Sequence, residues 1–195
     1  TMEETEAFVC DPQPDAFVRV VDRLLASPHY GERWGRHWLD VARYSDGLGG
    51  FLDGQGKRTE AWRYRDWVVE ALNRDLPFDQ FVKHQLAGDL MPEGSVTATG
   101  FLALGPSYIS DGNTAEGKAV AQAETLDDRI DVVTRGMLGL TATCARCHDH
   151  KFDPIPTQDY NSIAGVFHNT RNDDRSAPGT PQAEIDSYER SQAEI

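Results

Sequence analysis

Residues 144–148 decide how this chain is organised, and they read Cys144-Ala145-Arg146-Cys147-His148. Two thiols stand three positions apart, and a histidine directly follows the second thiol. On one helical turn the positions i, i+3 and i+4 share a face, so Cys144, Cys147 and His148 are expected to point at one object. This spacing is the attachment signal of a c-type haem, in which each thiol forms a thioether and the histidine ligates the iron.

Two other chemistries use the same residue types. A redox Cys-x-x-Cys pair belongs beside a βαβ unit, whereas the sequence around 144–148 predicts helices and loops. A zinc site takes four ligands, often from two separated pairs; His150 offers a further ligand, but the chain has no second cysteine pair. We therefore expect one covalent haem c, and a structural zinc site or a plain disulfide between Cys144 and Cys147 remains the alternative.

Four stretches of the chain resemble a family of large exported proteins that are abundant in planctomycetes and are labelled a cytochrome-like domain of unknown function. They are LGLTATCARCHDHKFDPI at 138–155, RWGRHWLDVARY at 33–44, WRYRDW at 62–67 and QLAGDL at 85–90. The resemblance covers about residues 3–170. It implies a c-type cytochrome-like module at the front of a longer chain, and it implies no established reaction.

Composition limits the class of protein and of partner. The length of 195 residues suits one helical cytochrome c-like domain over 1–170, followed by a linker and the start of a further helix over 171–195. The net charge of −13 repels phosphate backbones and argues against a nucleic-acid partner. No apolar run reaches the length of a membrane span. The expected partners are a redox protein or further domains of a parent chain, of which this sequence is a fragment.

Helical periodicity dominates the sequence, and no segment shows sustained strand-like alternation. The predicted fold is mainly α: a bundle-like domain of six or seven helices with long loops, and a haem between helices. Apolar positions predict helices at about 3–9, 16–26, 29–45, 60–74, 78–87, 116–140 and 158–168. Residues 98–104 form a short apolar insert of undefined type within a long connection.

The sixth ligand of the iron is a separate question, for which two residues are candidates. His37 lies on the aromatic stripe of helix 29–45, where it is either a core histidine bonded to a neighbour or the sixth ligand. Met137 offers a thioether that would give a raised potential, but it lies on the packing seam of its helix, where methionine is ordinary filler. Arg43 is a candidate for binding the haem propionates, or for an ion pair with Asp40.

Three further residues or groups have expected places. Cys10 is left free once the haem uses the other two thiols, and we expect it to be a small, semi-buried side chain. The acidic run around Asp127 and Asp128 is expected to be the solvated flank of its helix. His150 points away from His148 on a helical turn and is a candidate for a propionate contact or for a second partner.

Three functions fit these residues. The first is a c-type cytochrome module that transfers single electrons, with His148 as the proximal ligand, in a periplasmic or extracellular compartment where covalent attachment takes place. The second is a haem enzyme with an open sixth position, in which peroxide or another small ligand reacts and His37 or an arginine acts as the distal acid–base group. The third is a structural zinc or interaction module.

Overall fold

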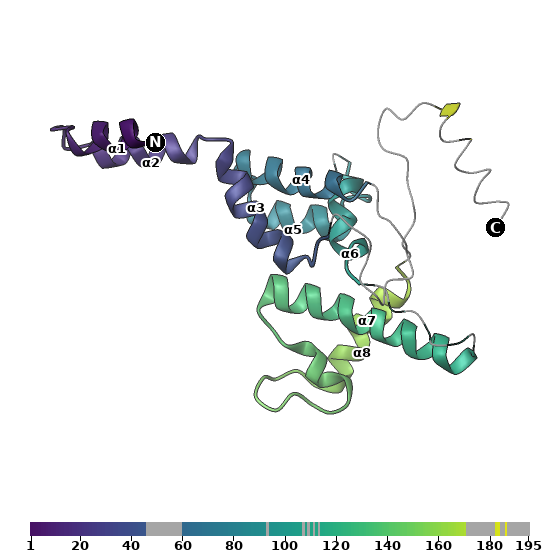
Figure 1. Cartoon of the computed structure of the whole chain (residues 1–195). Helices are drawn as coiled ribbons and strands as arrows, with labels where there is room; N and C mark the ends of the chain where they lie inside the picture. Colours follow the sequence, from purple (N-terminus) through teal and green to yellow (C-terminus); the bar gives the residue numbers. More distant parts are fainter. Residues whose placement is uncertain are drawn as a thin grey trace.

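The computed structural model describes residues 1–45, 60–92, 94–106, 108, 110, 112, 114–170, 182, 183 and 186. These residues form eight α-helices and two 3-10 helices (Figure 1). The linker and helix expected over 171–195 lie outside the described residues, apart from three positions.

A helical hairpin forms the N-terminal end of the chain. It consists of α1 (Met2–Val9) and α2 (Ala16–Leu25). Phe8 packs on Phe17 across the hairpin with ring centroids 6.5 Å apart. The hairpin extends away from the rest of the molecule (Figure 1), and Phe17 and Leu24 remain exposed. The helix predicted at 16–26 is therefore present as α2, but the apolar stripe of α2 is only partly covered.

An aromatic body follows the hairpin. Its elements are α3 (His29–Val41), α4 (Trp62–Asn73), α5 (Phe78–Ala87), the 3-10 helix η1 (Val96–Thr99) and α6 (Gly100–Ala103). Gly31 allows α3 to approach α4 closely, because a Cβ at this position would lie 2.4 Å from the carbonyl oxygen of Val69. Trp38 sits at the centre of the body, 5.8 Å from Phe101 and 4.9 Å from Phe81 between ring centroids.

The aromatic body contains a buried polar network. Gln85 is fully buried, and its Oε1 accepts hydrogen bonds from Trp38 Nε1 and from the hydroxyl of Tyr64, both at 2.7 Å. The Nε2 group of Gln85 donates to the carbonyl oxygen of Phe81 at 3.1 Å. The amide therefore accepts from two aromatic donors in the core, and Trp38 Nε1 also lies 3.2 Å from the hydroxyl oxygen of Tyr64.

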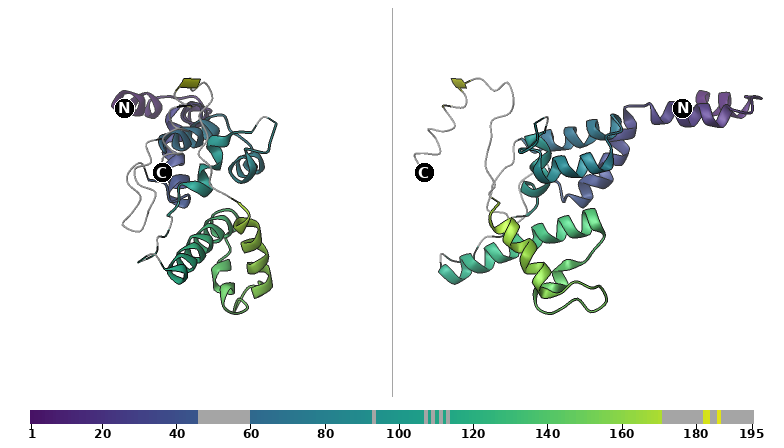
Figure 2. Two further views of the ribbon diagram at one scale, coloured as in Figure 1. Left: turned by 90° about the vertical axis from the view of Figure 1, so that its right-hand side faces the viewer. Right: turned by 180° about the vertical axis from the view of Figure 1, so that it is seen from behind.

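A second helical layer carries residues 144–148. It consists of α7 (Ala115–Leu138), the 3-10 helix η2 (Ala142–Arg146) and α8 (Thr157–His168). These elements pack around a smaller core of their own, formed by Ile130, Ala142, Ala145, Tyr160 and Phe167. Figure 2 shows from two further sides that α7 and α8 lie next to the aromatic body as a separate layer.

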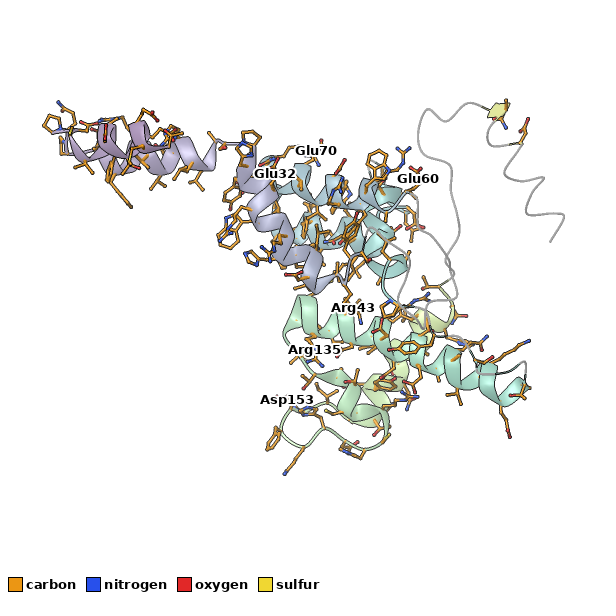
Figure 3. The ribbon with its side chains drawn as sticks, viewed as in Figure 1. Glu32, Arg43, Glu60, Glu70, Arg135 and Asp153 are labelled. Atoms are coloured by element: carbon orange, nitrogen blue, oxygen red, sulfur yellow. The ribbon has the colours of Figure 1, made fainter. Side chains whose placement is uncertain are left out.

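The two layers meet along α7. Val132 of α7 belongs to the aromatic core, and Gly136 faces Val41 so closely that an added Cβ would lie 2.7 Å from Val41 Cγ1. Arg43, just after α3, forms an ion pair with the carboxylate of Asp128 and donates from Nη2 to its carbonyl oxygen at 2.9 Å. Figure 3 shows Arg43 at this junction between α3 and α7.

The mainly α fold expected from the sequence is confirmed, and three details differ. The helix predicted over 29–45 ends at Val41, and the helix predicted over 116–140 ends at Leu138. The undefined insert at 98–104 belongs to η1 and α6. These two elements are only four residues each, too short to show a helical repeat of apolar residues.

Candidate functional site

The site is built where α7 stops. Gly139 caps α7 in the left-handed conformation, with φ of 68°, which is a backbone geometry that glycine adopts without steric cost. Its N–H donates to the carbonyl oxygens of Arg135 and Thr134 at the helix end. The chain then reverses and begins η2 at Ala142, so Cys144 lies in a short separate turn and not in a continuation of α7.

The η2 turn has a buried side and an exposed side. Ala142 and Ala145 are buried, at 2% and 0% exposure, in the small core of the second layer. Cys144 and Cys147 are both exposed with free thiols, and His148 is exposed as well. The turn therefore presents to solvent the three groups that the haem-attachment spacing selects.

His148 is held in one tautomer by its own backbone. Its Nδ1 lies 2.8 Å from the carbonyl oxygen of Asp149, and a carbonyl can only accept, so Nδ1 carries the proton and donates. The other ring nitrogen, Nε2, is then left unprotonated in the neutral ring. A histidine that donates through Nδ1 to a backbone carbonyl and offers Nε2 is oriented as metal-ligating histidines commonly are.

His150 has a structural role in the described residues. Its side chain is only 6% exposed. Its Nδ1 accepts hydrogen bonds from the backbone N–H of Asp153 at 2.8 Å and of Phe152 at 3.3 Å, so the proton is on Nε2, which donates to Thr141 Oγ1 at 3.1 Å. Both ring nitrogens are thus occupied, and His150 ties the loop after the site back to the residue that precedes η2.

Arg146, between the two cysteines, reaches back toward the helices. Its guanidinium lies 3.1 Å from Glu124 Oε1 and 3.5 Å from Asp127 Oδ2 on α7. The hydroxyl of Tyr160 on α8 donates to the same Asp127 carboxylate at 2.6 Å. The hydrogen bond to Glu124 raises the pKa of Arg146, while burial and the bond to Asp127 raise the pKa of Tyr160.

Exposed apolar residues flank the turn along the chain. Leu138, before it, is 63% exposed, and Phe152, after it, is 83% exposed. Arg135, in the last turn of α7, is held by Asp131 through a 2.8 Å ion pair. In Figure 3, Arg135 is on the last part of α7 and Asp153 marks the loop beyond the turn. Apolar side chains and a cation near two exposed thiols suit an apolar cofactor with acidic edges.

The other predicted site residues contact other parts of the chain. His37 is exposed on α3 and packs on Trp34 with ring centroids 5.6 Å apart, so it is not a core histidine. Met137 is half-buried against the aromatic core. Arg43 is bound to Asp128, and the prediction that it pairs with Asp40 is wrong.

Two further expectations are corrected. Cys10 is exposed and not semi-buried, because it lies just beyond α1 in the extended hairpin. Asp127 and Asp128 are not a solvated flank: each is half-buried and paired across elements, with Tyr160 and Arg43 respectively. Burial raises the pKa of Asp128, although the charge of Arg43 acts in the opposite direction.

Sequence reasoning missed the supporting residues of the site. Arg146 and its partners could have been found from the spacing of Glu124 and Asp127, three apart and therefore on one face of a helix. The clip formed by His150 and Thr141 has no such signal, because it joins two loops. Across the described ranges, no three His, Cys, Asp or Glu side chains are gathered to hold a metal ion, so a zinc site is not preformed there.

Comparison with known proteins gives one match. A family model described as a protein of unknown function (DUF1549), named PSCyt2, matches residues 1–172. No curated protein and no solved structure matches the chain. Among the described helices, none is both long and apolar enough to cross a membrane.

Proposed function

The chain belongs to the PSCyt2 family of proteins of unknown function, and from the geometry of its 144–148 turn we propose that it is a c-type cytochrome module carrying one covalent haem. The observation that carries the proposal is the arrangement of the η2 turn. Two free thiols and one histidine of fixed tautomer are exposed in and directly after η2, while Ala142, Ala145 and Arg146 face the helices.

Each residue of the turn has a defined role in this proposal. Cys144 and Cys147 hold the cofactor through thioether bonds, and His148 offers Nε2 as the axial ligand while Asp149 fixes its ring. Ala142 and Ala145 anchor the turn in the core. The exposed side chains of Leu138 and Phe152 also suit a haem at this position, because a porphyrin would cover apolar surface that is otherwise in contact with water.

When bound, haem supplies a one-electron couple whose potential depends on its axial ligands, its burial and nearby hydrogen bonds. The chain's own contribution is to orient the ligands and to exclude water from one side of the turn. We propose that the module exchanges electrons with a redox partner or with further domains of a parent chain. The net charge of −13 suits a partner with a cationic surface.

The proposal also assigns a compartment. Covalent c-type attachment takes place outside the cytoplasm, so the module should act in the periplasm or outside the cell. This agrees with the resemblance of four of its stretches to exported planctomycete proteins with a cytochrome-like label. The assigned compartment depends on covalent haem attachment, and it fails if no haem is attached.

Optical spectra of the oxidised and the dithionite-reduced protein test this function. We expect a sharp α-band on reduction; a band unchanged by carbon monoxide would indicate that both axial positions are filled, as in an electron-transfer haem. A reduced spectrum that carbon monoxide shifts would replace electron transfer with small-ligand chemistry at an open sixth position. A colourless protein after expression with haem-attachment machinery would overturn the cytochrome proposal itself.

A further inference from the structure

We propose that Arg146 is a positioning residue that clamps the haem-attachment turn onto α7 and α8, and that its charge, balanced by Glu124 and Asp127, sets the potential of the site. The inference rests on the proposed function only for its second half. The clamp is a property of the chain without any cofactor, so the two halves can be tested separately.

The clamp is visible in the contacts of one side chain. Arg146 bridges two carboxylates one turn apart on α7, at 3.1 Å from Glu124 and 3.5 Å from Asp127. Tyr160 of α8 donates to Asp127 at 2.6 Å, so three elements meet at this guanidinium. The guanidinium is about one third exposed, with 32% of the side chain accessible. Exposed ion pairs contribute little, but Arg146 is partly buried and has a charge-assisted hydrogen bond to Glu124 and an ion pair with Asp127, which together fix the direction of its side chain.

The direction of Arg146 determines the direction of its neighbours. In η2 the side chains of Ala145 and Arg146 face the helices, which leaves Cys144 and Cys147 facing solvent. If Arg146 were released, the turn would be held by the small side chains of Ala142 and Ala145 and by the hydrogen bond between His150 and Thr141. The orientation of Cys144 and Cys147 relative to α7 would then be less restricted.

The charges of Arg146 and its two carboxylate partners also predict in which direction the haem potential should shift. Arg146 contributes one positive charge, and Glu124 and Asp127 contribute two negative charges within 3.5 Å of it. Ferric haem carries one more positive charge than ferrous haem, so a nearby cation favours the ferrous form and raises the potential. Removing Arg146 should therefore lower the potential, and removing the charge of Asp127 should raise it.

The first test measures midpoint potentials of Arg146→Gln, Asp127→Asn and the double variant in the haem-loaded protein. We expect shifts of opposite sign in the single variants, each up to about tenfold in the ferric–ferrous equilibrium, which is about 59 mV for one electron. The double variant should return close to wild type. Arg74→Gln is the matched control, because it removes one positive charge from an exposed pair with Glu70 on α4.

The second test uses the full chain without haem and measures hydrogen exchange of the backbone amides at 142–147. Arg146→Gln should raise their exchange rates several-fold, Arg146→Lys should restore part of the protection, and Arg74→Gln should leave it unchanged. If Arg146 only holds the turn in place and its charge has no effect on the haem, exchange at 142–147 should still rise in Arg146→Gln. The midpoint potentials of Arg146→Gln and Asp127→Asn should then shift in the same direction. That combination would overturn the charge half of the inference.

Unchanged exchange at 142–147 in Arg146→Gln would overturn the clamp. If the wild-type chain never takes up haem but the exchange result holds, then the cytochrome proposal fails and the clamp stands. If haem is attached and neither exchange nor potential responds to Arg146→Gln, then the inference fails and the cytochrome proposal stands.

Discussion

At the scale of single residues, His150 shows how the site is held together. Replacing it by alanine removes its bond to Thr141 and leaves the partly buried N–H of Asp153 without an acceptor. We expect His150→Ala to lower the free energy of unfolding by about 1–3 kcal/mol, measured by urea unfolding. His168→Ala, at an exposed position on the last turn of α8, should change it by less than about 0.5 kcal/mol. Equal effects of the two variants would mean that His150 is not the clip described.

Tyr64 gives a residue-scale prediction for pH. Burial raises the pKa of its phenol, so the folded protein keeps the proton that the unfolded chain loses near pH ~10. The stability that Tyr64 contributes is complete below that pH and declines as pH rises toward the folded-state value, by up to about 1.4 kcal/mol per unit. Thermal unfolding of wild type and Tyr64→Phe between about pH 9 and 12 measures this. An equally steep decline in Tyr64→Phe would contradict it.

The residues that sequence reasoning identified, and those it missed, differ in one physical respect. Cys144, Cys147 and His148 lie within five consecutive positions, so their local spacing was enough to identify them as candidates. The partner of Arg43 lies 85 positions away in the chain, and no local pattern indicates that Asp128 is that partner. His37 shows the opposite failure: its helical stripe predicts an apolar surrounding, yet His37 is exposed, while Trp38 of the same stripe packs against the core.

At the scale of elements, the position where α7 ends can be tested with two glycine-to-alanine substitutions that should change stability in opposite directions. Gly139 has φ of 68°, where a Cβ costs energy, so Gly139→Ala should destabilise the protein by about 1 kcal/mol. Gly165 lies within α8 with nothing within 4 Å of an added Cβ, so Gly165→Ala should stabilise it by about 0.5–1 kcal/mol. Calorimetric melting of both variants decides this, and a shift of the same sign in both would contradict the assigned helix end.

The elements themselves were mostly predictable, because their apolar residues recur with the helical period. Periodicity identifies the apolar face of a helix but not what covers that face. The α1–α2 hairpin demonstrates the difference: its helices lie where expected, yet Phe17 and Leu24 are exposed. Helix ends were less predictable, since α7 ends at Leu138, two residues before the expected stop at Leu140, where Gly139 caps it.

At the scale of the whole molecule, the junction between the two layers depends on few contacts. Asp128→Ala leaves the half-buried guanidinium of Arg43 without its carboxylate. We expect a loss of about 1–3 kcal/mol and, in calorimetry, broadening of the unfolding transition as the layers become less coupled. Asp79→Asn, in an exposed pair with Lys83, is the control and should leave the transition unchanged. A single sharp transition at the wild-type temperature in Asp128→Ala would show that the pair does not join the layers.

The intact mass of the denatured protein reports whether one haem is covalently attached to Cys144 and Cys147. The chain should be exported from a host that attaches haem, then unfolded and reduced before measurement. The account predicts the mass of the chain plus one haem in wild type and in Cys10→Ser, and the mass of the bare chain when both Cys144 and Cys147 are replaced by serine. A bare-chain mass in wild type, with or without bound zinc in the native protein, would contradict it.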